Sequence, residues 1–221
     1  MLNTAKRTNK KASERFNFSK ERFIRSVGYW VVKAYIRTIL EWGQLADVHN
    51  KDQRRKNMRA IKSADTSIEV RVRKMLWHAG YRYRLNVKSL TGTPDIYLPK
   101  YRAAIQINGC LWHGHNCPQF VLPKTRTEFW KEKISSNVQR DLRSISELKK
   151  QNIRALLIWE CAIRGNGRLE PDYLLKLISR WLPTDDSLSV IDKQGIRSAS
   201  LEDLNAQFNE ALNFQLKTNP A

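Results

Sequence analysis

The sequence predicts an α/β sandwich in which helices flank a mixed β-sheet. Segments with amphipathic helical periodicity alternate along the chain with short apolar runs that are typical of strands. The chain has 221 residues, of which 41% are hydrophobic, so it can hold one well-buried domain with extensions.

The N-terminal region is basic and is expected to have two parts. Residues 1–18 lack hydrophobic periodicity, which indicates a disordered basic arm. Residues 23–42 carry aromatic and aliphatic side chains at helical spacing and predict an amphipathic helix. Because Lys33 and Arg37 interrupt this stretch, it favours a helix that docks on protein rather than a membrane anchor.

The central elements are expected in the order helix, three strands, helix, strand, helix. Thr66-Ser67-Ile68-Glu69 is a capping-box pattern, which predicts a helix that ends before Gly80. Alternation and short apolar runs predict strands over 81–87, 95–98 and 103–108.

A second capping box, Thr125-Arg126-Thr127-Glu128, predicts a long amphipathic helix that continues to Leu148. A strand over 154–160 and a helix over 172–181 are expected next. The remaining tail is polar, with a weak helical pattern over 201–212.

The charge balance indicates a partner that carries phosphates. Forty Lys and Arg against 21 Asp and Glu give a net charge of +19 and an isoelectric point near 10.1. Such a balance is typical of nucleic-acid-binding proteins. No secretory signal peptide is visible, and we expect a cytoplasmic, nucleoid-associated protein of bacterial type.

The three cysteines and one nearby histidine form a set of zinc ligands. Cys110, His115 and Cys117 lie in one short loop, and Cys161 closes a predicted strand that could return beside it. Three thiolates and one imidazole suit a closed structural zinc site. A disulfide would leave one cysteine over, while isolated buried cysteines remain the simplest alternative. Spacing alone leaves open whether His113 or His115 is the ligand.

Polar residues near two predicted strands suggest a second, harder metal site. Asp95 follows a turn, and its carboxylate is the natural magnesium ligand beside Gln106-Ile107-Asn108. Taken alone, Asp95 is better interpreted as a residue that caps a backbone amide in a turn. A neutral His113 could accept a proton from water. Glu69 and Asp141, taken singly, look like a capping residue and a solvated ion-pair partner.

Other side chains are candidates for DNA contact. Leu111, Trp112 and Trp130 could wedge between base pairs, although most tryptophans are core residues. Basic and polar residues suited to contact phosphates are Lys56, Asn57, Arg59, Lys124 and Arg126.

Short motifs from about Ala46 to about Ile196 occur in a distinctive order. They are Ala46-Asp47-Val48-His49, Lys56-Asn57-Met58-Arg59-Ala60-Ile61, Asp65-Thr66 with Ile68-Glu69, Pro94-Asp95, Gly109-Cys110 with Trp112-His113, Thr125-Arg126-Thr127-Glu128-Phe129-Trp130, Asn137-Val138 with Arg140-Asp141, and Trp159-Glu160-Cys161-Ala162. In these motifs the chain closely resembles the very short patch repair (Vsr) DNA mismatch endonucleases.

The resemblance implies a restriction-endonuclease-like core and a magnesium-dependent enzyme. Such an enzyme nicks DNA on the 5′ side of the thymine in a T:G mismatch left by deamination of 5-methylcytosine. By position, Asp95 and the backbone carbonyl of Ile107 would bind magnesium, and His113 would act as the general base or orient the water. The resemblance also assigns Glu69 and Asp141 to the surrounding acidic, hydrogen-bonded shell, against their interpretation as isolated residues.

The resemblance further implies that Cys110, His115, Cys117 and Cys161 hold zinc, which leaves His113 outside that site. It implies that Leu111, Trp112 and Trp130 form the wedge that opens the mismatch.

Three positions depart from the family pattern. Asn108 stands where a histidine is common, Leu111 where phenylalanine is frequent, and Ile107 where the family has a polar residue. Two alternatives follow: a zinc-stabilised DNA-binding module without cleavage, and a nickase of the same fold with different specificity.

The resemblance also suggests how the chain is organised. We expect an endonuclease domain over 46–196, with an N-terminal extension over 1–45 and a polar tail over 197–221. The expected partner is double-stranded DNA with a T:G mismatch, bound by a monomer without membrane contact. Mismatch-repair proteins are candidate further partners.

Overall fold

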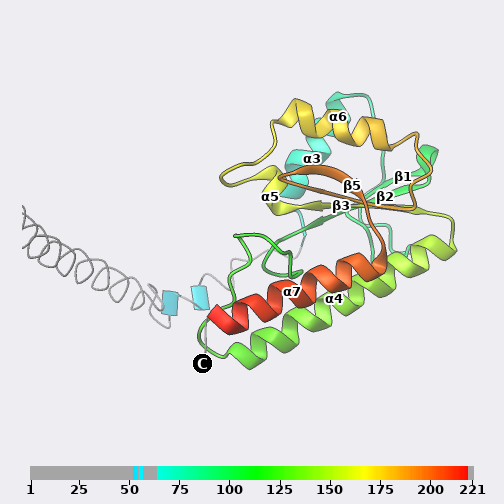
Figure 1. Ribbon diagram of the computed structural model, residues 1–221. Helices are drawn as coiled ribbons and strands as arrows, with labels where there is room; N and C mark the ends of the chain where they lie inside the picture. The colour runs from blue at the N-terminus through cyan, green and yellow to red at the C-terminus, as the bar shows by residue number, and fades with distance from the viewer. Residues whose placement is uncertain (1–51, 54, 57–63, 219–221) are drawn as a thin grey trace, which may run out of the picture. The chain divides into compact units, whose positions relative to one another are not determined.

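The computed structural model describes residues 52–53, 55–56 and 64–218. The predicted basic arm, the helix over 23–42, and Asn57 and Arg59 lie outside these residues. From residue 64 onward the described chain forms an α/β/α arrangement with helices on both faces of a five-stranded sheet (Figure 1).

The sheet is mixed, as predicted. Its strands follow one another in the order β1 (Ile96–Leu98), β2 (Ala103–Asn108), β3 (Arg154–Trp159), β4 (Leu188–Asp192) and β5 (Gly195–Ser198). The pairs β2–β3 and β3–β4 are parallel, whereas β1–β2 and β4–β5 are antiparallel. The central strands are therefore parallel and both edges are hairpin strands.

Two helices cover each face of the sheet (Figure 1). One face carries α3 (Ser67–His78) and α6 (Pro171–Trp181), and the other carries α4 (Thr127–Lys150) and α7 (Leu201–Thr218). The shorter elements are the 3₁₀ turn η1 (Pro99–Tyr101) and the helix α5 (Glu160–Ile163).

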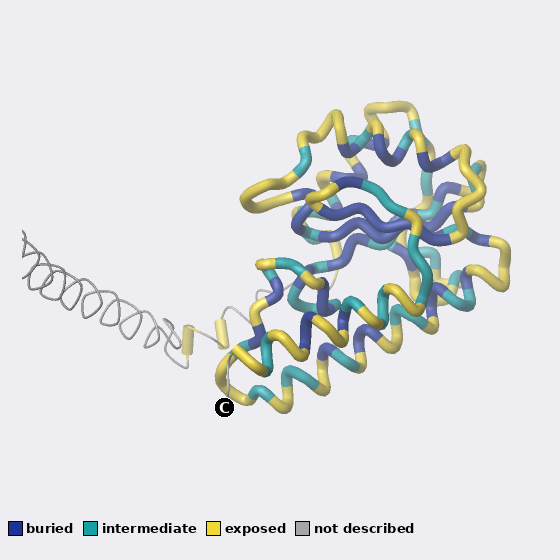
Figure 2. The backbone as a smooth tube through the Cα atoms, viewed as in Figure 1, coloured by how far each residue is buried: buried dark blue, intermediate teal, exposed yellow. Residues whose placement is uncertain are grey.

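The core lies in two layers because β2 and β3 are buried on both faces (Figure 2). Ile105 and Leu156 belong to the cluster that includes α3 and α6, while Leu157 packs with Ile145 of α4. Strands that are buried on both sides read as continuous apolar runs, which is why these two were predicted correctly.

Helix α3 begins where the capping box predicts. Thr66 is its N-cap, and the Thr66 hydroxyl accepts a hydrogen bond from the Glu69 N–H at 3.4 Å. The second predicted capping box is wrong. Helix α4 starts at Thr127 after Arg126, which has a left-handed backbone, and the Thr127 hydroxyl donates to the Lys124 carbonyl instead.

The strand predicted over 81–87 is also wrong. Only Arg84 pairs there, in an isolated bridge with Tyr97, and the positive φ of Asn86 interrupts extended backbone. The segment that contains β4 and β5 was assigned no strand, yet these strands complete the sheet. The weak helical pattern over 201–212 corresponds to α7, which packs through Phe208 and Leu212 against Ile134 and Val138 of α4.

Among the helices that the structure describes, none combines the length and apolar character needed to cross a lipid bilayer.

Candidate functional site

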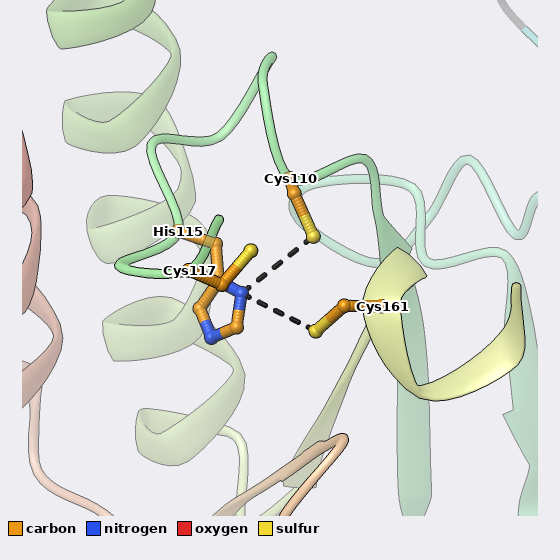
Figure 3. A group of neighbouring side chains, drawn as sticks. All are labelled: Cys110, His115, Cys117 and Cys161. Atoms are coloured by element: carbon orange, nitrogen blue, oxygen red, sulfur yellow. Dashed lines mark hydrogen bonds between the residues drawn. The ribbon is translucent and has the colours of Figure 1, made fainter. Parts of the chain in front are cut away.

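The three cysteines and His115 converge at one point, as Figure 3 shows. Cys110 follows β2, His115 and Cys117 lie in the succeeding loop, and Cys161 is in α5 directly after β3. Because β2 and β3 are parallel neighbours, their carboxyl ends bring both segments to the same edge of the sheet. The predicted ligand set is therefore assembled by topology.

The geometry of this group suits a metal ion. The four candidate ligand atoms all lie within 4.8 Å of one another. The sulfurs of Cys110 and Cys161 are each 3.6 Å from Nδ1 of His115. Three sulfurs and one imidazole nitrogen at such separations match the donor set of a closed tetrahedral site.

Hydrogen bonding within the group shifts the protonation of its members. Hydrogen bonds with Cys117 and Cys161, together with burial, raise the pKa of the Cys110 thiol, whereas hydrogen bonds with Cys110 and Cys161 lower the pKa of Cys117. Burial disfavours the charged imidazole, but the nearby Asp192 carboxylate and the sulfurs of Cys117 and Cys161 raise the pKa of His115 to about 10. Metal binding would displace these shared protons.

The ring of His115 is held from other directions as well. It stacks on Trp159 with ring centroids 4.3 Å apart and an interplanar angle of 10°. Gly114, next to it, has φ of +65°, and a Cβ there would clash with the ring of Phe208 from α7. The loop is therefore packed between the sheet edge and α7.

Asp95 lies just before β1 and points at the neighbouring strand. Its Oδ2 accepts a hydrogen bond from the Ile107 N–H at 2.7 Å. Burial raises the pKa of Asp95 to about 6, although the Ile107 hydrogen bond favours the carboxylate. Glu69 raises this pKa further, while Arg73 and His113 lower it, so these charges surround one site.

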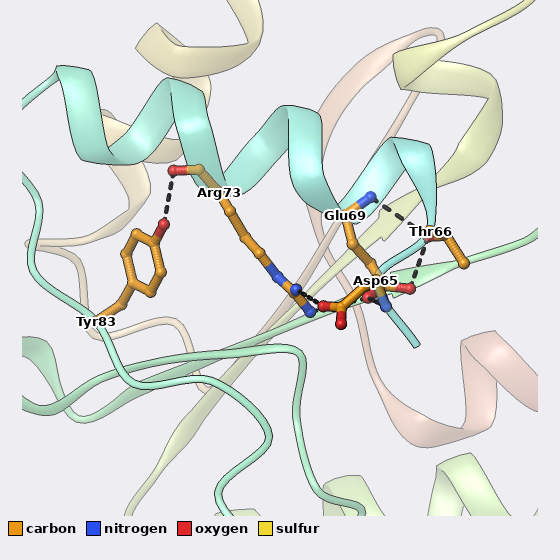
Figure 4. Close-up of polar contacts among 5 residues, drawn as sticks. All are labelled: Asp65, Thr66, Glu69, Arg73 and Tyr83. Atoms are coloured by element: carbon orange, nitrogen blue, oxygen red, sulfur yellow. Dashed lines mark hydrogen bonds and ion pairs between the residues drawn. The ribbon is translucent and has the colours of Figure 1, made fainter. Parts of the chain in front are cut away.

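Glu69 and Arg73 are the buried members of a polar cluster at the start of α3 (Figure 4). Glu69 accepts hydrogen bonds from the Thr66 hydroxyl at 2.6 Å, the Asp65 N–H at 3.0 Å and NH2 of Arg73 at 2.8 Å. Arg73 also pairs with Asp65, and its carbonyl accepts a hydrogen bond from the Tyr83 hydroxyl. Glu69 therefore caps the helix and also lies beside Asp95, so its two interpretations are compatible.

His113 and Asp141 form a direct pair. Nδ1 of His113 is 2.5 Å from Oδ2 of Asp141, which projects from α4. An Nδ1–H donated to this carboxylate leaves Nε2 with a lone pair that can accept a proton. The loop is anchored to α4 nearby, because the Asn137 amide donates to the Trp112 carbonyl at 2.9 Å. Asp141 is thus more than a solvated charge.

The candidate wedge residues cluster beside this pair. The rings of Trp112 and Trp130 are 5.5 Å apart, and both are partly exposed. Leu111 is half-buried against the cluster that includes Ile134 and Val138. Asn108 is buried at the end of β2 and lines a hollow together with His113 and Asp141.

The predicted phosphate contacts do not converge to the same extent. Lys124 and Arg126 are exposed at the start of α4, with the Arg126 guanidinium over the Phe129 ring. Lys56 is also exposed, and it belongs to a separate compact unit of the chain.

Two charged residues at the site were not predicted. Arg73 stands four residues after Glu69, a spacing that places both on one helix face and could have indicated the pair. Asp192 lies 3.8 Å from Nε2 of His115. It had no comparable signal because the strand that carries it was not predicted.

Comparison with known proteins identifies the family to which the chain is similar. A family model described as DNA mismatch endonuclease Vsr matches residues 46–119. The chain is 45% identical over 152 residues to the DNA mismatch endonuclease Vsr of Escherichia coli (strain K12), covering 69% of this chain and 97% of the relative.

Two nicking enzymes are also similar. Type II nicking enzyme V.NmeAIP of Neisseria meningitidis is 41% identical over 123 residues, covering 56% of this chain and 88% of the relative. Type II nicking enzyme V.XorIIP of Xanthomonas oryzae pv. oryzae is 39% identical over 126 residues, covering 57% and 93%.

Proposed function

Because this chain belongs to the Vsr family of DNA mismatch endonucleases, we propose that it nicks duplex DNA on the 5′ side of the thymine in a T:G mismatch. Family membership makes the chain a strand-nicking mismatch repair endonuclease, a hydrolase. The mismatch itself, its origin in deamination of 5-methylcytosine, and the position of the nick are the parts that we propose.

The observation that carries this proposal is the presence of two groups suited to nuclease chemistry: the Asp95 carboxylate, which accepts a hydrogen bond from the Ile107 N–H at 2.7 Å, and His113, whose Nδ1 is 2.5 Å from Oδ2 of Asp141. A nuclease needs a carboxylate for a hard metal ion and a group that accepts a proton from water. A binding module without cleavage has no use for either, so their presence favours an enzyme over that alternative.

We assign the magnesium ion to Asp95 and the backbone carbonyl of Ile107. Magnesium is commonly held by one or two carboxylates together with water and substrate phosphates, which this sparse donor set fits. When bound, the ion would stabilise negative charge that develops on the scissile phosphate and the leaving oxygen.

The protein groups then handle the proton of the attacking water. His113 accepts that proton at Nε2, while Asp141 holds the ring through Nδ1 and stabilises the resulting imidazolium. The water oxygen forms the new bond to phosphorus as the bond to the leaving oxygen breaks. Hydrogen bonds from Arg73 and Thr66 hold the Glu69 carboxylate, and its negative charge, in a fixed position near Asp95.

We further propose zinc as the ion of the Cys110, His115, Cys117 and Cys161 group, because three thiolates and one imidazole are a common structural zinc set. The loop that this group anchors also carries Leu111, Trp112 and His113, so zinc would hold the wedge and the proton acceptor in register. Trp130 would complete the wedge from α4.

The remaining proposals concern the whole chain. We propose an endonuclease domain over residues 46–196 with a restriction-endonuclease-like core, to which the tail adds the end of β5 and the helix α7 that covers one face of the sheet. We propose that it acts as a monomer in the cytoplasm at the nucleoid. Lys56, Asn57, Arg59, Lys124 and Arg126 would contact DNA phosphates, with Asn108 near the cleaved strand.

A nicking assay with matched duplexes tests the proposal. In fixed salt with magnesium, we expect the wild-type protein to nick a T:G duplex and to leave T:A and C:G duplexes intact. Asp95→Ala should bind the T:G duplex but not nick it. Equal nicking of all three duplexes would indicate a nickase of other specificity, and binding without nicking by the wild type would favour the module without cleavage.

A further inference from the structure

The β4–β5 hairpin brings a buried carboxylate to the outer side of the metal-binding group. Asp192 ends β4 and is only 4% exposed. Its Oδ2 lies 3.8 Å from Nε2 of His115, whereas Nδ1 of the same ring faces the sulfurs of Cys110 and Cys161. The imidazole therefore stands between the sulfur cage and this carboxylate.

Asp192 is itself held firmly. Its Oδ1 accepts a hydrogen bond from the Gln194 N–H at 2.7 Å, and its Oδ2 pairs with NH1 of Arg197 at 2.5 Å. NH2 of Arg197 reaches Gln207 of α7 at 3.4 Å. The hairpin turn and α7 together determine where this carboxylate points.

We propose that Asp192 is the outer partner of the His115 ligand. Its carboxylate attracts the Nε2–H of the ring and so favours the tautomer whose Nδ1 lone pair faces the three sulfurs. Metal-ligating histidines usually donate their second ring N–H to a carboxylate or carbonyl, and this contact orients the ring and strengthens it as a ligand. Asp192 is a positioning residue in this role, because it acts on the ion only through His115.

The packing around the ring agrees with such a role. Trp159 stacks on one face of the imidazole and determines its plane, but stacking leaves the choice between the two ring orientations open. A negative charge on one side and thiols on the other remove that ambiguity, since a flipped ring would direct the carbon Cδ2 at the sulfurs and the carbon Cε1 at Asp192. Removing the carboxylate should therefore weaken the metal centre while its four ligands stay intact.

The competing explanation is that Asp192 only fastens the hairpin through Arg197 and Gln194. Both explanations predict some loss of stability on substitution, so stability alone does not separate them. Metal affinity separates them, because a hairpin fastener acts on folding whereas a histidine partner acts on the ligand.

The test uses zinc and cobalt with the full-length protein. We compare Asp192→Asn with Asp186→Asn, a matched control whose side chain is exposed ahead of β4. Zinc transfer to a chromogenic chelator gives the affinity, and the sulfur-to-cobalt charge-transfer and ligand-field bands report the ligand geometry. We expect a loss of about 10- to 100-fold in zinc affinity and altered cobalt bands for Asp192→Asn, with no change for Asp186→Asn.

Two further variants keep the proposal testable if Asp192→Asn folds poorly. Asp192→Glu retains the charge and should recover part of the affinity, and Arg197→Gln leaves the carboxylate without its anchor and should give an intermediate loss. Zinc affinity and cobalt bands like those of the wild type in every folded variant would overturn the proposal. The readout is metal binding alone, so its failure is distinguishable from a failure of the proposed nicking activity.

Discussion

Asp95 is expected to destabilise the fold that it serves. Burial raises its pKa from 3.8 to about 6, and one pKa unit corresponds to about 1.36 kcal/mol, so the ionised form costs the native state about 3 kcal/mol. Because Asp95 is only half-buried, solvent screens part of this cost. We therefore expect Asp95→Asn to raise the free energy of unfolding by about 1–2 kcal/mol at pH 8 while abolishing nicking.

The sign of the pH dependence follows from linkage. Between pH 3.8 and about 6 the native state keeps a proton that the unfolded state has lost, so wild-type stability falls as pH rises through this window. Above about pH 6 the native state bears the full free-energy cost of the ionised Asp95 carboxylate. Asparagine carries no charge in either state, so the stability gain should be largest at pH 8 and about half as large at pH 5.

Urea unfolding without added magnesium, at pH 5 and pH 8, measures the gain in the free energy of unfolding on Asp95→Asn at each pH. Asp186→Asn is the control, because its exposed side chain should change neither value. A gain of the same size at the two pH values would show that it does not come from ionisation of Asp95. A loss of stability at pH 8 would refute the reasoning outright.

Three further substitutions address the proton acceptor, its partner Asp141 and the buried ion pair. His113→Ala should lower the nicking rate by about 10²- to 10⁴-fold, and Asp141→Asn should lower it by less, because Asp141 acts through the His113 ring. The affinity for DNA measured by gel shift should stay within about twofold of wild type for both variants. A normal nicking rate for His113→Ala would remove His113 from the mechanism. Arg73→Met leaves the charge of the buried Glu69 carboxylate unpaired and should lower the free energy of unfolding, measured in urea, by about 3–5 kcal/mol. The control Lys74→Met changes an exposed residue and should leave this free energy nearly unchanged. An equally small effect of Arg73→Met would contradict the buried-pair argument.

The elements that were predicted correctly are those whose signals are local. Thr66 and Glu69 share one turn of backbone, so the start of α3 is legible from four consecutive residues. The strands β2 and β3 are buried on both faces, which leaves the apolar runs 103–105 in β2 and 155–159 in β3.

The errors arise where tertiary contacts outweigh local pattern. Alternating side chains over 81–87 suggested a strand, but no neighbouring strand extends far enough to pair beyond Arg84. Strand β4 is short and contains Ser189 and Asp192, whose polar side chains are buried only because the sheet and α7 surround them. A single sequence does not indicate that a polar residue such as these is buried within a strand.

The candidate site divides in the same way. The cysteines and His115 could be grouped because their residue types are uncommon and share one chemistry. Asp141 could not be joined to His113 from the residues alone, since they are separated by a loop and half of α4, and the resemblance to a known family placed Asp141 only in the shell around the magnesium site. The pair of Arg73 with Glu69 could have been inferred from their spacing on α3, whereas the pair of Arg73 with Asp65 depends on how α3 meets the preceding turn.

The split origin of the metal-binding group has a consequence for how the protein is made. Cys110, His115 and Cys117 leave the ribosome first, whereas Cys161 follows only after α4 and β3 have been synthesised. The fourth thiol reaches the others when β3 aligns beside β2, so binding of an ion by all four residues would report that this parallel pairing has formed. A nascent chain stalled before Cys161 would expose two thiols and an imidazole in an open loop, and would be vulnerable to oxidation until translation resumes.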